Sequence, residues 1–157
     1  PNTPALVGRG MTGLFDAAGA AADRQLAETV IRTTGDVLWV EREELLDAVT
    51  ALSGSGPAYV FYFLEAMQQA GAELGLTASQ ARRLAVGTFA GGTELAADSP
   101  EPLATLRERV TSKGGTTYAA LTAMEQAGVK AAFVKAMHAA CVRAAELGDE
   151  FGRTPPH

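Results

Sequence analysis

Apolar residues recur at helical spacing along most of this chain, and only the first forty or so residues contain runs typical of strands. Apolar positions three and four residues apart predict amphipathic helices, whereas short β-branched and aromatic runs favour strands. We therefore expect helices at residues 21–34, 43–52, 57–74, 77–97, 103–110, 118–126 and 130–147. Short strands are expected at residues 11–15 and 37–40. The pattern predicts a mainly α chain that opens with a small α/β segment.

Turn and capping residues mark most of the expected helix boundaries. Pro57 suits the first position of a helix, where its missing N–H is not needed. Thr77 stands three residues before Gln80, which is the spacing of a capping box. Helix stops are expected at three glycines, Gly35, Gly75 and Gly128.

Two helices carry features that point to a subunit interface. Residues 59–64 leave almost no polar side in the first turns of their helix, and such a helix must be buried all round, most simply by a second subunit. Glycines inside the helix at 77–97 each cost up to about 1 kcal/mol against alanine. These glycines, expected to admit another backbone, are Gly87, Gly91 and Gly92. The last helix should bury one face made of Val134, Met137, Cys141, Ala144 and Leu147.

The composition narrows the class of protein. The 157 residues are 47% hydrophobic and carry a net charge of −5, which makes nucleic acid an unsuitable partner. No apolar run approaches the roughly 20 residues of a membrane span, and no basic-then-apolar signal segment opens the chain, so we expect no membrane partner and a cytoplasmic location. The single cysteine excludes an internal disulfide and a Cys-rich zinc site.

The stretch from Val110 to Tyr118 is the centre of the candidate chemistry. Gly114 and Gly115 permit unusual backbone angles between two helical patterns, and Thr116 and Thr117 then stand at the expected N-cap of the next helix. Backbone N–H groups at a helix start favour an anion such as a phosphate or a small carboxylate. A plain Gly-Gly turn with a threonine cap explains the same residues.

The remaining candidate side chains have ordinary explanations. Cys141 lies on the expected buried face of the last helix, and His138 has no Cys or His partner at metal-ligand spacing, so we expect no metal site. Solvated helix faces account for Glu65, Glu73 and Glu94. Ser53 and Ser55 are interpreted as helix-boundary residues, and no acid–base pair is evident.

Three motifs, in the same order and at the same spacing, resemble those of pyrroline-5-carboxylate reductases. They are Pro-Asn-Thr-Pro-Ala at 1–5, Asp-Ala-Val-Thr-Ala-Leu-Ser-Gly-Ser-Gly-Pro-Ala-Tyr at 47–59, and a third set made of Pro102, Leu106, Val110, Thr111, Ser112, Gly114, Gly115, Thr117, Ala120, Leu121, Met124 and Glu125. The resemblance extends from Pro1 to about Gly148. Three ordered motifs are far more specific than any one of them.

The resemblance implies a helical dimerisation domain of the 6-phosphogluconate dehydrogenase C-terminal-like type, preceded by a short α/β remnant of a Rossmann coenzyme domain. Residues 1–41 would belong to the remnant, 42–148 would form the dimerisation and substrate domain, and 149–157 would be a disordered tail. Gly54 and Gly56 do not supply the Gly-rich coenzyme fingerprint, because they follow no strand.

The resemblance also implies a reaction, the NADPH- or NADH-dependent reduction of 1-pyrroline-5-carboxylate to L-proline in proline biosynthesis. The absence of an acid–base pair suits hydride transfer, in which the cofactor supplies the hard chemistry. The implied substrate-binding residues are Ser112 with the N–H groups around Gly114, Gly115 and Thr116, and Thr117. Thr117 would be the catalytic residue, with its hydroxyl at the ring nitrogen of the imine.

Asn2, Thr3 and Pro4 would lie near the nicotinamide end of the coenzyme. The family resemblance implies a homodimer in which the loop of one subunit faces the coenzyme domain of another, with a decamer as the larger assembly. Lys113 departs from the family pattern, which usually has proline at this position. Because the Gly-rich phosphate loop is not matched, we expect this chain alone neither to bind NAD(P)H nor to turn over.

Two alternatives stay open at this point. The chain could be a non-catalytic helical oligomerisation module, or part of a related two-domain NAD(P)H reductase that acts on another imino acid or a 2-hydroxy acid. The central loop has no cluster of Arg or Lys of the kind that normally binds a phosphate, although Lys113 adds one positive charge.

Overall fold

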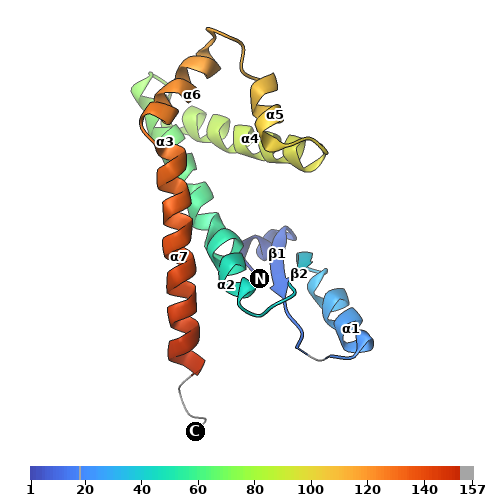
Figure 1. The fold of residues 1–157 in the computed structure, drawn as a ribbon. Helices are drawn as coiled ribbons and strands as arrows, with labels where there is room; N and C mark the ends of the chain where they lie inside the picture. The colour runs from blue at the N-terminus through green and yellow to red at the C-terminus, as the bar shows by residue number, and fades with distance from the viewer. Residues whose placement is uncertain (18, 153–157) are drawn as a thin grey trace. The chain divides into compact units, whose positions relative to one another are not determined.

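The computed structural model describes residues 1–17 and 19–152, which form two compact units. The first unit comprises Pro1–Val60 and Phe133–His157, and the second comprises Phe61–Ala132. The elements follow in the order η1 (Thr3–Val7), β1 (Gly10–Leu14), α1 (Ala21–Ile31), β2 (Gly35–Trp39), α2 (Leu45–Val49), η2 (Thr50–Gly54), α3 (Gly56–Glu73), α4 (Ala78–Ala97), α5 (Leu103–Arg109), α6 (Thr116–Gln126) and α7 (Val129–Gly152) (Figure 1). The predicted fold class, a mainly helical chain after a short α/β segment, is confirmed.

The small sheet needs a glycine where β2 begins. β1 and β2 pair in parallel from Gly10 opposite Gly35 to Leu14 opposite Trp39. A Cβ on Gly35, whose φ is +153°, would lie 2.0 Å from the carbonyl oxygen of Gly10. Gly35 therefore opens a strand where only glycine has room, and our expectation that it stops the preceding helix is wrong. α1 ends three residues earlier than predicted, at Ile31, and a hydrogen-bonded turn leads into β2.

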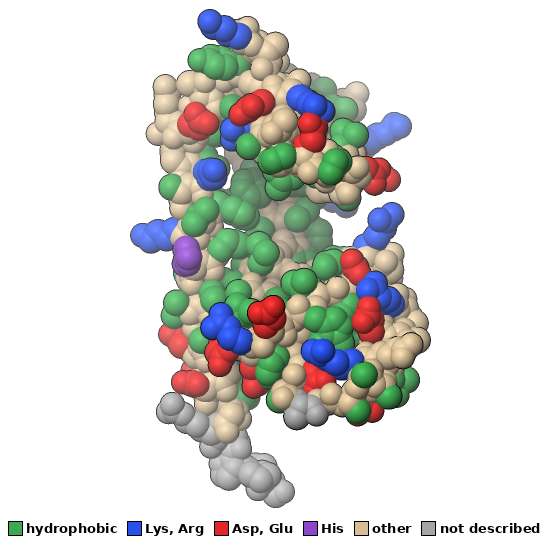
Figure 2. All heavy atoms as spheres, turned by 45° about the vertical axis from the view of Figure 1, so that its right-hand side comes forward, with side chains coloured by type: hydrophobic (Ala, Val, Ile, Leu, Met, Phe, Trp, Pro, Cys, Tyr) green, Lys and Arg blue, Asp and Glu red, His purple; other side chains and the backbone are tan. Residues whose placement is uncertain are grey.

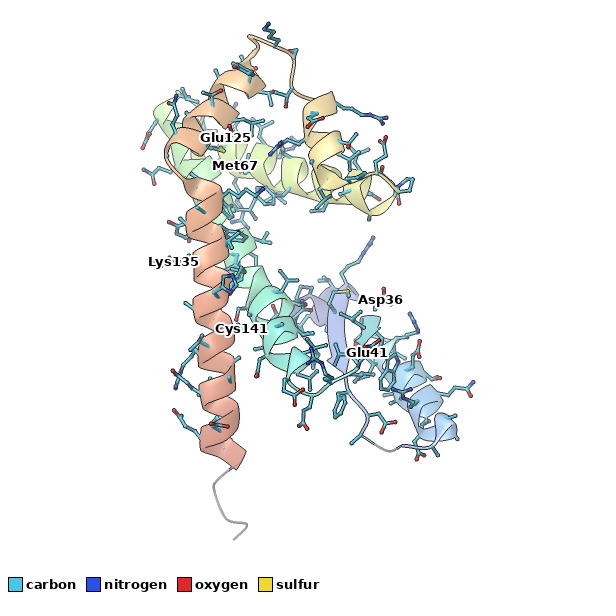
Figure 3. The ribbon with its side chains drawn as sticks, viewed as in Figure 1. Asp36, Glu41, Met67, Glu125, Lys135 and Cys141 are labelled. Atoms are coloured by element: carbon cyan, nitrogen blue, oxygen red, sulfur yellow. The ribbon has the colours of Figure 1, made fainter. Side chains whose placement is uncertain are left out.

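Charged side chains connect α1 to the end of the sheet. Arg32 forms ion pairs with Glu28 (2.6 Å) and with Asp36 (2.8 Å), the latter labelled in Figure 3. The indole Nε1 of Trp39 donates to the second carboxylate oxygen of Glu28 at 3.2 Å, and the Arg24 guanidinium lies 4.6 Å from the centre of the Trp39 ring. Hydrogen bonds from Arg32 and Trp39 lower the pKa of Glu28. The pKa of Asp36 is lowered by the Val37 N–H and then by Arg32.

The helix expected at residues 43–52 is replaced by two shorter elements. α2 ends at Val49, and η2 continues it as a turn of π-helix in which the Ser55 N–H donates to the carbonyl of Thr50. Gly13 of β1 lies against this segment, since a Cβ there would come within 2.8 Å of Val49. The π-turn, which has more residues per turn than an α-helix, thus begins directly after Val49, the residue of α2 that packs on β1.

The helices α3, α4 and α5 begin within one residue of the starts that the sequence predicts at 57, 77 and 103. α3 starts with Gly56 and Pro57 and is terminated at Gly75, whose φ is +98°. Thr77 caps α4 through the predicted capping box with Gln80. A Cβ on Gly71 of α3 would lie 2.7 Å from that of Ala81, so the two helices approach each other through small residues. The break at residues 99–102 precedes α5, also as expected.

α7 extends beyond its predicted end at Leu147 and reaches Gly152. Arg143 pairs with Glu146 and with Glu150, which stabilises the last turns of the helix and raises the pKa of the guanidinium. Four residues of the tail predicted at 149–157 are therefore helical, and residues 153–157 lie outside the described part of the chain. The expected buried face of α7 is only half-buried, with Val134 45% exposed.

Few apolar side chains in the described residues are buried. Only Ala51, Ala81 and Ala85 are both apolar and buried, and no large side chain in the described residues is fully covered. Figure 2 shows hydrophobic side chains open to view between the charged ones on one face of the molecule. In the run at 59–64, Phe61 is 61% and Tyr62 is 69% exposed. The burial expected for this run is therefore not supplied by the described residues of the chain itself.

Candidate functional site

The loop between α5 and α6 is a tight turn. The N–H of Gly115 donates to the carbonyl of Ser112 at 3.0 Å, and Gly114, the third residue of the turn, has a φ of +75°. A positive φ at the third position of a hydrogen-bonded turn is typical of type II and favours glycine. Lys113 occupies the second position, which type II turns often give to proline. Gly114 is therefore a glycine because of its backbone angle.

Gly115 is a glycine for a different reason from Gly114: there is no room for a side chain at this position. Its φ of −81° and ψ of 177° suit any residue, but a Cβ would lie 2.6 Å from the hydroxyl oxygen of Ser112. The Ser112 side chain therefore folds over the half-buried Gly115. Ser112 itself is exposed, which leaves its hydroxyl accessible beside the start of α6.

The start of α6 differs from our expectation. Gly115 is the N-cap and no side chain caps the helix, so the prediction that Thr116 or Thr117 is the N-cap is wrong. The glycine takes that position because the turn has already set its extended backbone. Thr116 and Thr117 become the first helical residues, whose N–H groups have no acceptor within a helix. Thr117 is half-buried and Thr116 is exposed.

The hydrogen bonds of the loop also change the set of available donors. The Gly115 N–H is used inside the turn, so it does not join the N–H groups at the start of α6. The N–H groups of Thr116, Thr117 and Tyr118, with the helix dipole, favour an anion at this helix end. Thr111 closes α5 on the other side through a 2.6 Å bond from its hydroxyl to the carbonyl of Arg107. Arg109 is paired with Glu101, and Lys113 is exposed.

The opening loop, which belongs to the first unit, is organised by the side chain of Asn2. Its Oδ1 accepts from the Met11 N–H at 2.9 Å, and its Nδ2 donates to both the carbonyl and the hydroxyl of Ser53 at 3.1 Å. These bonds engage both N–H donors of the amide. Of the residues expected at the coenzyme, Thr3 is exposed and Pro4 is half-buried, whereas Asn2 has both N–H donors of its side chain engaged.

Sequence reasoning missed Ser53 and Tyr59, which it treated as a helix boundary and part of an apolar run. The Tyr59 hydroxyl donates to the carbonyl of Ala51 at 3.1 Å, and its ring lies edge-on to that of Phe133, with centroids 5.8 Å apart. The available signal was Pro57, since a proline four residues on cannot supply the N–H that the Ser53 carbonyl would meet in an α-helix. π-turns such as η2 occur frequently at functional sites.

Each of the other candidate side chains stands on a helix and is exposed or half-buried. Cys141 is half-buried midway along α7 (Figure 3), and His138 is exposed. Glu65, Glu73 and Glu94 are exposed. Within residues 1–17 and 19–152 no group of three or more His, Cys, Asp or Glu side chains could hold a metal ion. Across the same residues, no helix has the combination of length and apolar character needed to cross a membrane.

Comparison with known proteins agrees with this geometry. The family model for the pyrroline-5-carboxylate reductase dimerisation domain matches residues 43–147, about two thirds of the chain. The pyrroline-5-carboxylate reductase of Pseudomonas aeruginosa is 43% identical over 154 residues, which are 98% of this chain and 56% of that protein. That of Haemophilus influenzae is 42% identical and matches over 94% of this chain and 55% of its own length. The chain thus spans little more than half the length of these curated relatives.

Solved structures give the same result. The pyrroline-5-carboxylate reductase of Coxiella burnetii superposes with a TM-score of 0.89 at 42% identity, over 94% of this chain and 55% of that one. The Plasmodium falciparum pyrroline carboxylate reductase, solved with NADP bound, gives a TM-score of 0.87 at 31% identity, over 94% of this chain and 61% of that one. From the ordered motifs, the turn before α6 and these likenesses together, the chain belongs to the pyrroline-5-carboxylate reductase family.

Proposed function

We propose that this chain contributes the dimerisation and substrate-binding part of an enzyme that reduces 1-pyrroline-5-carboxylate to L-proline. The observation that carries the proposal is the Ser112–Gly115 turn leading directly into α6. A helix N-terminus behind a glycine turn suits a small carboxylate, and the family provides the matching substrate.

In this proposal, the residues of the loop bind and orient the substrate. The hydroxyl of Ser112 and the N–H groups of Thr116 and Thr117 hold the carboxylate, and the Thr117 hydroxyl donates to the ring nitrogen of the imine. A nicotinamide coenzyme, NADPH or NADH, supplies the hydride when bound. Polarising the C=N bond through its nitrogen makes its carbon a better hydride acceptor, because the negative charge that develops on nitrogen is stabilised. As the new C–H bond forms, the π electrons of the C=N bond move onto nitrogen, and a proton from water completes the N–H of L-proline.

The same proposal includes the assembly and the setting of the enzyme. Residues 1–41 belong with the coenzyme-binding part and 42–148 with the dimerisation part. A homodimer, which assembles further into a decamer, and a cytoplasmic location complete it. The name of the matching family model, which describes a dimerisation domain, supports the homodimer.

The direct test is a coenzyme-oxidation assay on a protein of full family length that carries this chain. Reduction of 1-pyrroline-5-carboxylate well above the rate with an open-chain 2-oxo acid is the expected result. A faster rate with the 2-oxo acid would favour the related reductase that acts on a 2-hydroxy acid. Turnover of neither substrate would leave an oligomerisation module as the better description.

A further inference from the structure

The side chain of Asn2 connects the opening loop and β1 to η2, all within the first unit. Its amide contacts the backbone of β1 at Met11 and both polar groups of Ser53, which is 51 residues away. The Met11 N–H can only donate, so the atom facing it must be the amide oxygen, and the NH₂ group must face Ser53. The orientation of the Asn2 amide is thereby fixed by its partners.

The carbonyl of Ser53 is available to Asn2 because of the local sequence. In an α-helix this carbonyl would accept from residue 57, which is a proline and has no N–H. The next N–H along, that of Ala58, donates to Ser55 instead, at 3.1 Å. The π-turn and Pro57 together leave an acceptor at Ser53 that a partly buried structure must satisfy. The Nδ2 group of Asn2 supplies the missing donor.

The bonds at Asn2 join two functional parts of the chain. Asn2 and Met11 precede residue 43, where the dimerisation family model begins, and Ser53 lies within that model. The adjacent residues Thr3 and Pro4 are those expected at the coenzyme. A shift of η2 would therefore move the Thr3–Pro4 segment, and a shift of that segment would move η2.

We propose that Asn2 and Ser53 form a positioning pair: Asn2 does not bind the coenzyme through its own side chain, but holds the Thr3–Pro4 segment in place by hydrogen bonding to Ser53. The Ser53 hydroxyl can be removed by mutation, while the hydrogen bond from Asn2 to the Ser53 carbonyl remains. This inference rests on the proposed function, since it assigns a role within that coenzyme site.

The test uses a full-length reductase carrying this chain, with coenzyme affinity measured by NADPH fluorescence and with steady-state kinetics. Ser53→Ala removes one of the Asn2 hydrogen bonds and should weaken coenzyme binding and raise the coenzyme KM by about three- to tenfold, with kcat nearly unchanged. Ser53→Thr keeps a hydroxyl and should restore affinity. Ser55→Ala is the matched control, a neighbouring serine whose side chain makes none of the bonds described here.

The double variant separates a positioning role from direct binding. If Asn2 acts through Ser53, Asn2→Ala combined with Ser53→Ala should bind coenzyme no more weakly than Asn2→Ala alone. Independent, additive losses would overturn the proposal, as would an unchanged coenzyme dissociation constant for Ser53→Ala. A wild-type protein that does not reduce 1-pyrroline-5-carboxylate would refute the proposed function instead, and the dissociation constants would still test the pair. Equal melting temperatures of the Ser53 variants exclude a general loss of folding.

Discussion

Gly114 and Gly115 stand side by side, yet each is a glycine for a different physical reason. Gly114 has a left-handed backbone, with a φ of +75°, and open space around it. Gly115 has an ordinary backbone, but Ser112 occupies the space that a side chain would need. A substitution at Gly114 strains the turn, whereas one at Gly115 displaces Ser112, a candidate substrate ligand.

The first prediction concerns Thr117 in a full-length enzyme. Thr117→Ala keeps the backbone N–H and removes the hydroxyl proposed to meet the imine nitrogen. Losing a hydrogen bond to a charged group costs about 1.5–3 kcal/mol, which corresponds to a fall of roughly 10- to 100-fold in kcat/KM. Thr117→Ser should recover most of the loss. Because Gly115, not Thr117, is the N-cap, near-normal kinetics of the alanine variant would leave the hydroxyl with no part in catalysis.

The second prediction concerns Lys113, the exposed second residue of the turn. Lys113→Pro fixes the φ angle that this position favours, and should raise the free energy of unfolding by about 0.4–1 kcal/mol in denaturant titrations. Lys113→Ala removes the charge without the ring and serves as the control. The kcat/KM of the proline variant should change by less than about tenfold, because one exposed charge contributes little. A destabilised proline variant would contradict the assignment of a type II turn.

At the scale of elements, the sequence predicted the helices that carry strong boundary signals. The capping box at Thr77 and the stop at Gly75 were correct because each depends on local chemistry alone. The π-turn and the use of Gly35 as a strand residue were missed because they depend on close packing against β1. Asn2 was missed because its partner Ser53 is 51 residues away: Pro57 marks the free Ser53 carbonyl, but no local pattern says which side chain reaches it.

The π-turn gives a prediction about Tyr59. The Ser55 N–H, which would reach Ala51 in an α-helix, donates to Thr50 instead, and the Tyr59 hydroxyl takes its place at Ala51. Tyr59→Phe should therefore lower the free energy of unfolding by about 1 kcal/mol in urea. Tyr62→Phe is the matched control, because Tyr62 is 69% exposed. Equal losses for the two variants would show that the bond to Ala51 contributes no stability.

A fourth prediction uses Trp39, the single tryptophan, as a reporter of acid titration. The folded-state pKa values of Glu28 and Asp36 are lowered, so their contribution to stability is present at neutral pH and is lost as the pH falls through those lowered values. Trp39 fluorescence should change in that acid window, because its indole donates to Glu28. Arg32→Gln should move the midpoint to higher pH, and Arg143→Gln, in a separate ion-pair set on α7, should not. Identical midpoints for wild type and Arg32→Gln would contradict the network.

At the scale of the whole molecule, the buried residues are too few and too small to account for the fold. The buried apolar residues among those described are alanines. Leu95, Leu103 and Val110, by contrast, line a groove formed by α4, α5 and the segment between them, and each is about 70% exposed. Obligate interfaces bury roughly 2,000 Å² or more and are rich in apolar side chains. These side chains are therefore suited to contact with a second copy, consistent with a dimerisation domain.

A fifth prediction concerns Gly91 in α4. The space around its Cβ position is open, so alanine should favour the helix by about 1 kcal/mol within one chain. If another copy packs against this glycine, Gly91→Ala should instead weaken the dimer, which sedimentation over a range of concentrations would measure. Gly148→Ala, at an equally open site in α7, is the control and should leave association unchanged. A Gly91→Ala dimer as tight as wild type would place the interface elsewhere.

The pairing of β1 with β2 has a practical consequence for handling this protein. A parallel sheet normally has both faces covered and further strands beside it, but in the described part of the chain the sheet has only these two strands. On each strand an outward N–H is already engaged within the chain: that of Met11 donates to Asn2 and that of Val37 to Asp36. Capping of this kind protects an edge strand from strand addition between molecules. Asn2→Ala frees the Met11 N–H and should consequently let concentrated preparations form β-rich aggregates by a route that does not involve the helices.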